Sequence, residues 1–288
     1  MAHFSSLHAM PDYYNIITEV DPAIVANIAN VLEIRAADPA QRHMLDAYLA
    51  EIDFPPDARV LEVGCGTGAV ARYLATRPEI GKIIGLDPSP HFIETAQRLA
   101  GTTPGLRFAQ GSAHDLSHLG ETFDVIIFHT TLCHLSRPEN ALAEAFHALG
   151  PGGWLAVFDG DYASTTLGTD DIDPLQDCAE AFRAYFIDNS WIGRLTPKLA
   201  SDAGFASISY RSHGYTEATD PNYMLTIVDR GADALAAHGK IGLPLATALK
   251  AEARQRVEEK RFFGHISYTS LIARKPDPAS LHTTPEAS

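Results

Sequence analysis

A nine-residue stretch, residues 60–68, constrains the fold more than any other part of the sequence. It reads Val-Leu-Glu-Val-Gly-Cys-Gly-Thr-Gly, so a mostly apolar run leads into three glycines at alternate positions. A helical pattern follows at once, over residues 69–77. The order of strand, glycine loop and helix is how an α/β protein presents backbone N–H groups to a nucleotide-like ligand. The stretch therefore predicts an α/β fold with a ligand at this loop.

Apolar runs and helical patterns alternate along the central part of the chain. Strands are predicted at residues 59–63, 82–86, 106–110, 123–128 and 154–158. Such alternation is typical of a doubly wound, mostly parallel sheet with right-handed crossovers. Two more strands are predicted, at residues 206–215 and 262–273. Within the alternating part, Ser136 to Glu139 reads as a capping box that begins a helix, and Gly150 to Gly153 reads as a turn.

The patterns divide the chain into four predicted parts. Residues 1–50 form an N-terminal helical segment, and residues 51–160 form the Rossmann-like core that binds the ligand. Residues 161–274 contain the rest of the sheet and a helical cap over its ligand edge, with a helical run at 222–260 broken at Gly231, Gly239 and Pro244. Residues 275–288 are rich in Pro, Ser and Thr, which predicts disorder.

Charge and composition exclude several classes of partner. The chain has 22 basic and 36 acidic residues and a net charge of −14. An acidic surface repels phosphate backbones and anionic lipid, so neither nucleic acid nor a membrane is expected as a partner. No apolar run is long enough to span a bilayer. Three widely spaced cysteines favour a reducing compartment, and we expect a cytoplasmic protein.

Two acids define the predicted ligand. Asp87 ends the second strand, 19 residues after Gly68, where a carboxylate can accept hydrogen bonds from both hydroxyls of a ribose. Glu62 lies two residues before the first glycine, where an anion would repel a pyrophosphate but attract a sulfonium or an ammonium group. The glycines also read GxGxG rather than GxGxxG. These features favour S-adenosylmethionine over NAD, and an NAD-dependent oxidoreductase remains the less favoured alternative.

Further motifs follow the first loop in order. Asp87-Pro88-Ser89 follows the second strand, and the others are residues 111–116, 123–135 and 149–155. Together they resemble class I S-adenosylmethionine-dependent methyltransferases, in the small-molecule branch that includes the ubiquinone and menaquinone C-methyltransferases. The resemblance covers about residues 55–160 closely. It implies a seven-stranded sheet whose last strand is antiparallel, beneath a helical cap.

The resemblance also implies which residues hold the cofactor. Gly64, Gly66 and Gly68, with Cys65 between them, would let the backbone approach it, and Asp87 with Pro88 would take its ribose. Ser112 and Ala113 would lie at the adenine, although Ser112 stands where the family commonly has an acid. His129 would lie where the methionine part meets the acceptor. Tyr14 and Arg35 are candidates for the cofactor carboxylate, and Arg35 reads equally well as a surface arginine.

The chemistry implied is methyl transfer to a small-molecule acceptor, with C- or O-methylation favoured. Aligning the reactants can supply about 7–11 kcal/mol of the barrier reduction, and a base is needed only if the acceptor must lose a proton. His129 and Asp159, after the fourth and fifth strands, are the candidate catalytic residues. The strand-four loop lacks an acid, so no metal is expected. A fold relative that catalyses a non-methylating reaction such as cyclisation stays open, as does a monomer or a homodimer.

Overall fold

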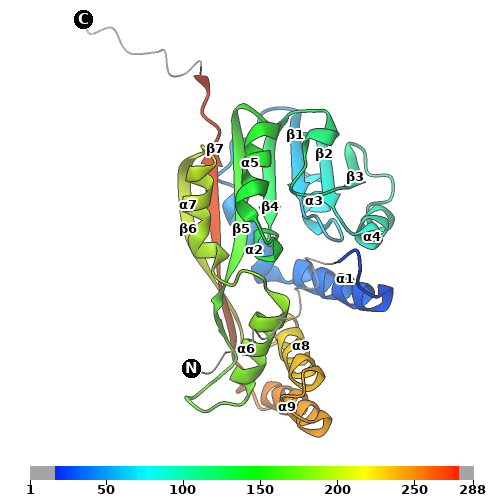
Figure 1. Ribbon diagram of the computed structural model, residues 1–288, viewed down its shortest axis with the longest axis vertical. Coiled ribbons are helices and arrows are strands. Elements are labelled where there is room, and N and C mark those ends of the chain that lie inside the picture. The colour runs from blue at the N-terminus through cyan, green and yellow to red at the C-terminus, as the bar shows by residue number, and fades with distance from the viewer. Residues whose placement is uncertain (1–16, 279–288) are drawn as a thin grey trace, which may run out of the picture.

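The computed structural model describes residues 17–278 of the 288-residue chain (Figure 1). Two predictions therefore lie outside the described residues. One is the cofactor contact of Tyr14, and the other is the disorder of the tail, of which only residues 275–278 are described. The four-part division of the chain also stays a prediction.

Within residues 17–278 the strands form one seven-stranded sheet in the order β3-β2-β1-β4-β5-β7-β6. β1 to β5 pair in parallel, and β7 lies antiparallel between β5 and β6. The predicted α/β fold class, with its antiparallel last strand, is confirmed. The strands have the following bounds: β1 Ala58–Val63, β2 Ile80–Asp87, β3 Leu106–Gln110, β4 Phe123–His129, β5 Leu149–Thr166, β6 Ala206–Glu217 and β7 Gly264–Arg274.

The helices of the described residues cover the sheet and one of its ends (Figure 1). They have the following bounds: α1 Pro22–Ala37, α2 Pro39–Leu49, α3 Ala69–Leu74, α4 Pro90–Ala100, α5 Pro138–Ala148, α6 Leu175–Phe186, α7 Ile192–Asp202, α8 Tyr223–Ala237 and α9 Leu243–Glu258. Short 3₁₀ turns, η1 Ser117–Leu119 and η2 Leu132–His134, follow β3 and β4. None of the described helices is long and apolar enough to cross a membrane.

The core lies where β1 and β4 run through the middle of the sheet. Residues 125–128 of β4 are fully buried, because helices cover both faces of a parallel strand in this position. Asp21 and Asp38 cap α1 and α2, and proline follows each of them at the first helical position. The helices that these caps begin, α1 and α2, contribute residues to the wall of the cavity at the ligand edge of the sheet.

Helices α6, α8 and α9 pack together beyond the ends of β5, β6 and β7, as the predicted helical cap requires (Figure 1). α8 continues through Gly231, so the predicted break there is wrong. A Cβ atom at Gly231 would lie 2.0 Å from the carbonyl oxygen of Cys178 on α6. The glycine allows close helix packing, and it does not end the helix.

Two other local predictions also need correction. α5 begins after Arg137, and no side chain caps it, so the predicted capping box at Ser136 does not form. β5 extends over 18 residues, from Leu149 to Thr166, instead of the five that were predicted. The glycines of the predicted turn lie within these bounds, at an irregularity in the register with β4, and Gly152 has a φ of 71°. The pairing of β5 with β7 continues past Phe158 to Asp161 and resumes at Thr166. The additional pairing partner, far away in the sequence, explains the extra length.

An ion pair between Arg256 of α9 and Asp173 joins the cap to the loop before α6. Both side chains are buried, and Asp173 also accepts hydrogen bonds from the backbone of Thr169 and Leu175, at 2.9 and 3.0 Å. The Arg256 guanidinium and these hydrogen bonds outweigh burial and lower the pKa of Asp173 to about 2, from 3.8. The carboxylate therefore stabilises the fold above pH 3.8, and this contribution is lost as the pH falls through about 2.

We expect Asp173→Asn to lower the free energy of unfolding by about 2 kcal/mol at pH 7. The substitution leaves the buried Arg256 guanidinium with Glu252 as its remaining carboxylate partner, at 2.7 Å. Urea titration should show the difference at pH 7, and it should shrink steadily below pH 4. Asp202→Asn, which removes an exposed pair with Lys198, is the matched control and should leave the midpoint unchanged. An equal loss at pH 7 and pH 3 would contradict this account.

Candidate active site

A cavity of about 240 Å³ opens at the carboxyl ends of β1, β2 and β4. Loops after these strands form its floor, and α1 and α2 form part of its wall. Ten residues predicted from the sequence line it: Arg35, Glu62, Gly64, Cys65, Gly66, Asp87, Pro88, Ser112, Ala113 and His129. The structure thus brings most of the predicted site residues together, while their individual roles stay predictions.

The glycine loop takes a conformation that other residues rarely adopt. Gly64, Gly66 and Gly68 have φ values of 72°, 53° and 75°, in the left-handed region that favours glycine. A Cβ atom at Gly64 would lie 2.3 Å from the Thr131 side chain. Gly68 does not line the cavity. It caps α3, and a Cβ there would lie 2.5 Å from the Phe108 ring, so its role in this structure is packing.

Asp87 ends β2 with its carboxylate at the glycine loop. One oxygen accepts the N–H of Gly66 at 2.8 Å, and the other accepts the N–H of Ser89 at 2.9 Å. Burial raises the pKa of Asp87 to about 6, and these two hydrogen bonds partly oppose that rise. A carboxylate has about four acceptor positions. Asp87 therefore retains acceptor capacity toward the cavity while it shapes the loop.

Glu62 is the second acid of the cavity and is only 2% exposed. Its carboxylate accepts the N–H of Ala71 in the first turn of α3, at 2.8 Å. Burial is the main cause that raises its pKa to about 8. The Asp87 charge adds to the rise, while the Ala71 bond and the charges of Arg72 and Arg35 oppose it. A cation in this cavity would favour the ionised form of both acids.

His129, at the end of β4, is held on two sides. Its ring stacks on Phe158 with centroids 4.8 Å apart, and its Nδ1 lies 3.0 Å from the hydroxyl of Tyr48 on α2. Burial, and then the Arg35 charge, lower its pKa well below 6.5. The ring is therefore neutral near pH 7. Tyr48 was not predicted as a site residue, because its sequence position marks it only as part of the apolar stripe of α2.

Asp159, the second candidate catalytic residue, is not among the residues that line the cavity, and its catalytic role stays a prediction. Its side chain is fully buried, and its two oxygens accept the N–H groups of Cys133 and Gly160, at 3.1 and 2.9 Å. The carboxylate holds the η2 turn after β4, and burial raises its pKa. In this structure the Asp159 carboxylate therefore positions backbone after β4 and within β5.

Several polar side chains of the wall were not predicted as site residues, among them Gln41, Arg42, Thr130 and Thr131. Gln41 and Arg42 belong to a helix that crosses the sheet edge only in the folded chain, and no local motif marks them. Thr131 donates to the carbonyl oxygen of Val63 at 3.0 Å and ties the β4 loop to β1. Among residues 17–278, no group of His, Cys, Asp and Glu is arranged to hold a metal ion.

Residues 61–157 match a protein family described as "Methyltransferase domain". The matched segment begins in β1, includes the glycine loop, Asp87 and His129, and ends in β5. The similarity to a methyltransferase domain is thus confined to this segment of the chain. The enzyme class predicted from the sequence is confirmed for it, and the cavity lies largely within its loops.

The relatives are similar over part of their length. An uncharacterised 37.1 kDa protein of a Streptomyces fradiae transposon is 31% identical over 63% of this chain and 53% of its own length. The phthiotriol/phenolphthiotriol dimycocerosates methyltransferase of Mycobacterium leprae is 32% identical over 51% of this chain and 53% of its own. The chain thus spans about half the length of these curated relatives.

A solved structure resembles the fold of nearly the whole chain. The crystal structure of the [4+2]-cyclase SpnF aligns with a TM-score of 0.56 over 95% of this chain and 99% of that chain, at 20% identity. This similarity concerns the fold. It extends beyond the methyltransferase domain to the helical cap and the last strands.

Proposed function

We propose that this chain transfers the methyl group of S-adenosylmethionine to a small-molecule acceptor. The observation that carries the proposal is the pair of buried acids, Glu62 and Asp87, beside a glycine loop in a methyltransferase domain. Two acids in one cavity disfavour an anionic ligand and suit a cationic one. S-adenosylmethionine, the cofactor of this class of domain, supplies a methyl group on a positively charged sulfur.

The residues of the cavity fit that cofactor. Asp87 is proposed to hold the ribose hydroxyls, and Glu62 to face its positive charge. Ser112 and Ala113 are proposed to lie at the adenine, and Arg35 at the carboxylate. The Ser112 hydroxyl already accepts the N–H of His114 at 3.1 Å, so it shapes the loop that would meet the base.

His129 is proposed to act as a hydrogen-bond donor toward the cavity. Tyr48 is fully buried, and a buried hydroxyl that donates to nothing costs about 1–3 kcal/mol, so Tyr48 donates to Nδ1 of His129. A neutral imidazole that accepts at Nδ1 carries its proton on Nε2. This tautomer can orient an acceptor or the cofactor, but Nε2 cannot take a proton. Alignment is then the main catalytic device.

We expect Tyr48→Phe to abolish the preference of His129 for the Nε2–H tautomer. Without the hydroxyl, Nδ1 of His129 no longer has a fixed donor, so the two neutral tautomers should become comparably populated. The ¹⁵N chemical shifts of the His129 ring, measured with S-adenosylhomocysteine bound, should show the change, and methyl transfer should slow by about tenfold. An unchanged Nε2–H tautomer in the variant would contradict the role given to Tyr48.

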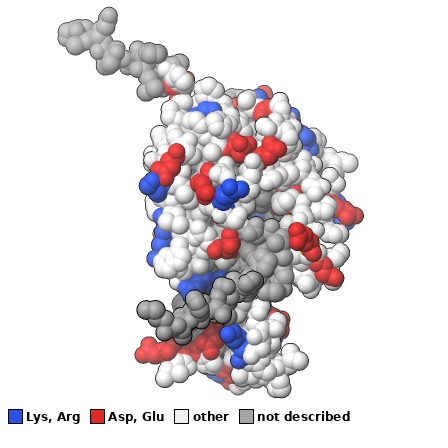
Figure 2. Space-filling model, in the orientation of Figure 1, with Lys and Arg blue, Asp and Glu red and all other residues white. Residues whose placement is uncertain are grey.

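The acceptor is proposed to be a small molecule methylated on carbon or oxygen, as in the branch that includes the ubiquinone and menaquinone C-methyltransferases. The name of the Mycobacterium leprae relative, a phthiotriol dimycocerosates methyltransferase, fits a small-molecule acceptor. A cytoplasmic location is proposed from the small number and wide spacing of the three cysteines. The net charge of −14, and the acidic and basic side chains interspersed over the face in Figure 2, favour neither nucleic acid nor a membrane as partner. A monomer or a homodimer is proposed.

Two measurements test the proposed function. Calorimetry should show saturable binding of S-adenosylmethionine and none of NAD. Incubation of a metabolite extract with methyl-labelled S-adenosylmethionine should then yield one labelled product. Binding of NAD alone would replace the proposal with an oxidoreductase. Conversion of an extract compound without transfer of label would replace it with a non-methylating reaction such as cyclisation.

A further inference from the structure

Two neighbouring side chains near the cavity carry buried polar atoms with no hydrogen-bond partner. They are both amide atoms of Gln41 and the hydroxyl of Tyr268. Gln41 is 5% exposed and lines the cavity from α2, and Tyr268 of β7 is fully buried. The large majority of buried side-chain polar atoms in proteins have a hydrogen-bond partner. Three orphaned atoms on adjoining side chains therefore indicate a place built for a polar group that comes from outside.

Two side chains, those of Gln41 and Tyr223, lie close to the Tyr268 hydroxyl. Burial is the main cause that raises the pKa of Tyr268; a weak interaction with the Gln41 amide lowers that pKa, and one with Tyr223 raises it. Neither interaction has the geometry of an ordinary hydrogen bond, so the Gln41 amide atoms and the Tyr268 hydroxyl stay unsatisfied. A ligand atom between them could accept from one and bond with the other. A hydrogen bond between Gln41 and Tyr268 would instead use the donor and the acceptor that this ligand atom needs.

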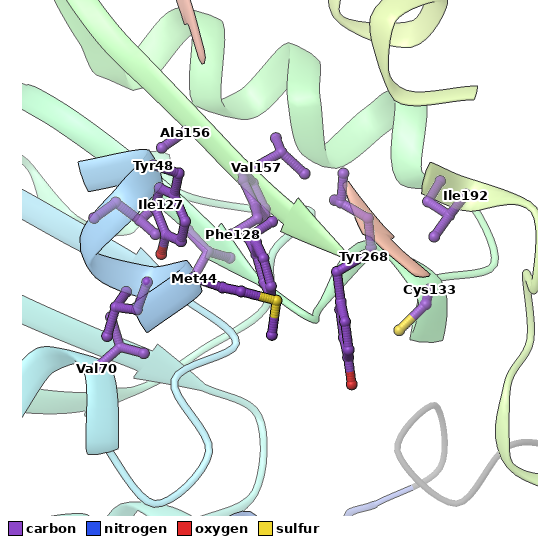
Figure 3. Close-up of a cluster of buried hydrophobic side chains, with 14 of the residues drawn as sticks. Met44, Tyr48, Val70, Ile127, Phe128, Cys133, Ala156, Val157, Ile192 and Tyr268 are labelled. Atoms are coloured by element: carbon purple, nitrogen blue, oxygen red, sulfur yellow. The ribbon is translucent and has the colours of Figure 1, made fainter. Parts of the chain in front are cut away.

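Stacked aromatic rings hold Tyr268 in place relative to His129, the candidate catalytic residue in the cavity wall. The Tyr268 ring stacks on Phe158, with centroids 5.1 Å apart and planes at 8°. The opposite neighbour of Phe158 is His129, which stacks on it at 4.8 Å. Stacked rings have little freedom to turn, so Tyr268 and His129 keep a set separation. Figure 3 shows the Tyr268 ring, from β7, and the Met44 side chain, from α2, in one cluster of buried side chains.

The position of the pair separates it from the cofactor contacts. In the sheet order β2-β1-β4-β5-β7, Asp87 and Glu62 lie on β2 and β1, whereas Tyr268 lies on β7. His129, at the end of β4, lies between them. An acceptor at Gln41 and Tyr268 would thus meet the cofactor near His129. This arrangement matches a transfer reaction, in which two ligands approach one point from opposite sides.

We propose that Gln41 and Tyr268 form the acceptor subsite, and that they bind the hydroxyl or carbonyl oxygen of a neutral, largely apolar molecule. An amide and a phenol are both uncharged, and together they offer donors and acceptors to a single oxygen. Leu45 on α2 and Leu135 after β4 supply apolar wall of the cavity. The assignment rests on the proposed function, because it names the acceptor of that same site.

Binding of model acceptors to the full chain tests the assignment. With S-adenosylhomocysteine saturating, we would titrate 2-naphthol and cyclohexanol as neutral probes and 2-naphthoate as an anionic probe. At least one neutral probe should bind, and 2-naphthoate should bind at least about tenfold more weakly than 2-naphthol. Gln41→Leu and Tyr268→Phe should each weaken binding of the neutral probe about tenfold, the effect of one lost hydrogen bond.

Controls separate a binding role from a structural one. Tyr210→Phe removes a hydroxyl that donates to the carbonyl oxygen of Gly193, and it should leave probe binding unchanged. Gln41→Leu and Tyr268→Phe should bind S-adenosylhomocysteine within about twofold of the unmodified chain. Because the atoms they remove have no partner, the melting temperature of each variant should stay the same or rise.

The outcomes distinguish the two proposals. If S-adenosylhomocysteine does not bind the unmodified chain, the proposed function is overturned, and the acceptor assignment falls with it. If it binds but no neutral probe does, or 2-naphthoate binds best, the assignment alone is overturned. The same holds if both variants bind the probe as the unmodified chain does. A lower melting temperature with unchanged probe binding would show that the orphaned atoms instead hold structural water.

Discussion

Asp87→Ala is expected to weaken binding of S-adenosylmethionine at least about 100-fold. The substitution removes the acceptors proposed for both ribose hydroxyls, and each hydrogen bond to a charged group is worth about 1.5–3 kcal/mol. Since about 1.4 kcal/mol is a factor of ten in affinity, two such bonds account for a loss of this size. The variant also removes the acceptor of the Gly66 N–H, which holds the glycine loop.

Calorimetry with the full chain measures this loss directly. The matched control is Asp202→Ala, which removes a carboxylate that pairs with Lys198 on the surface of α7. It should bind the cofactor as the unmodified chain does. Asp87→Asn should fall between the two, because its amide keeps one acceptor but turns an N–H₂ group toward a backbone N–H. A loss of less than about fivefold for Asp87→Ala would remove Asp87 from the cofactor site.

Glu62→Gln is expected to make the free protein more stable at alkaline pH and to weaken cofactor binding. The folded pKa of Glu62, about 8, lies above its ordinary value of 4.5. A raised folded pKa means that the folded state holds the proton more tightly than the unfolded state. Stability from this group is therefore present in full below pH 4.5 and is lost as the pH rises to about 8. The glutamine side chain does not ionise and avoids that loss.

The size of the effect follows from the pKa difference. A shift of 8 − 4.5 = 3.5 units corresponds to about 5 kcal/mol, which is an upper bound on the gain in unfolding free energy of Glu62→Gln above pH 8. The amide oxygen can still accept the Ala71 N–H, so α3 keeps its start. Urea titrations at pH 5 and pH 9 measure the gain, which should be much larger at pH 9.

Binding should move in the opposite direction. S-adenosylmethionine should bind the unmodified chain more tightly as the pH rises from 6.5 to 8.5, because the ionised form of Glu62 attracts the positive charge. In Glu62→Gln this rise should disappear, and affinity at pH 8.5 should fall about tenfold to 100-fold. If the variant binds equally well and shows the same pH dependence, Glu62 does not face the cofactor charge.

Local patterns in the sequence determined the fold class and the cofactor side of the site. A strand, its glycine loop and the helix after it are adjacent along the chain, and their conformations depend on neighbouring residues. Glu62, Gly64 and Asp87 could be located from spacing alone, because parallel strands bring their carboxyl ends to one edge of the sheet. The same reasoning placed His129 at that edge, and the structure has it in the cavity wall.

Only the tertiary structure decided the other side of the site. Gln41 and Tyr268 are 268 − 41 = 227 residues apart, and α2 and β7 bring them together over the stacked rings of Phe158 and His129. In the sequence Tyr48 reads as a core residue, and only the structure shows its hydroxyl at His129. Only the structure likewise shows that the two oxygens of Asp159 accept backbone N–H groups. Whether a side chain is buried, which group it contacts and where it points all depend on residues far away in the sequence. A local sequence pattern therefore cannot predict these properties.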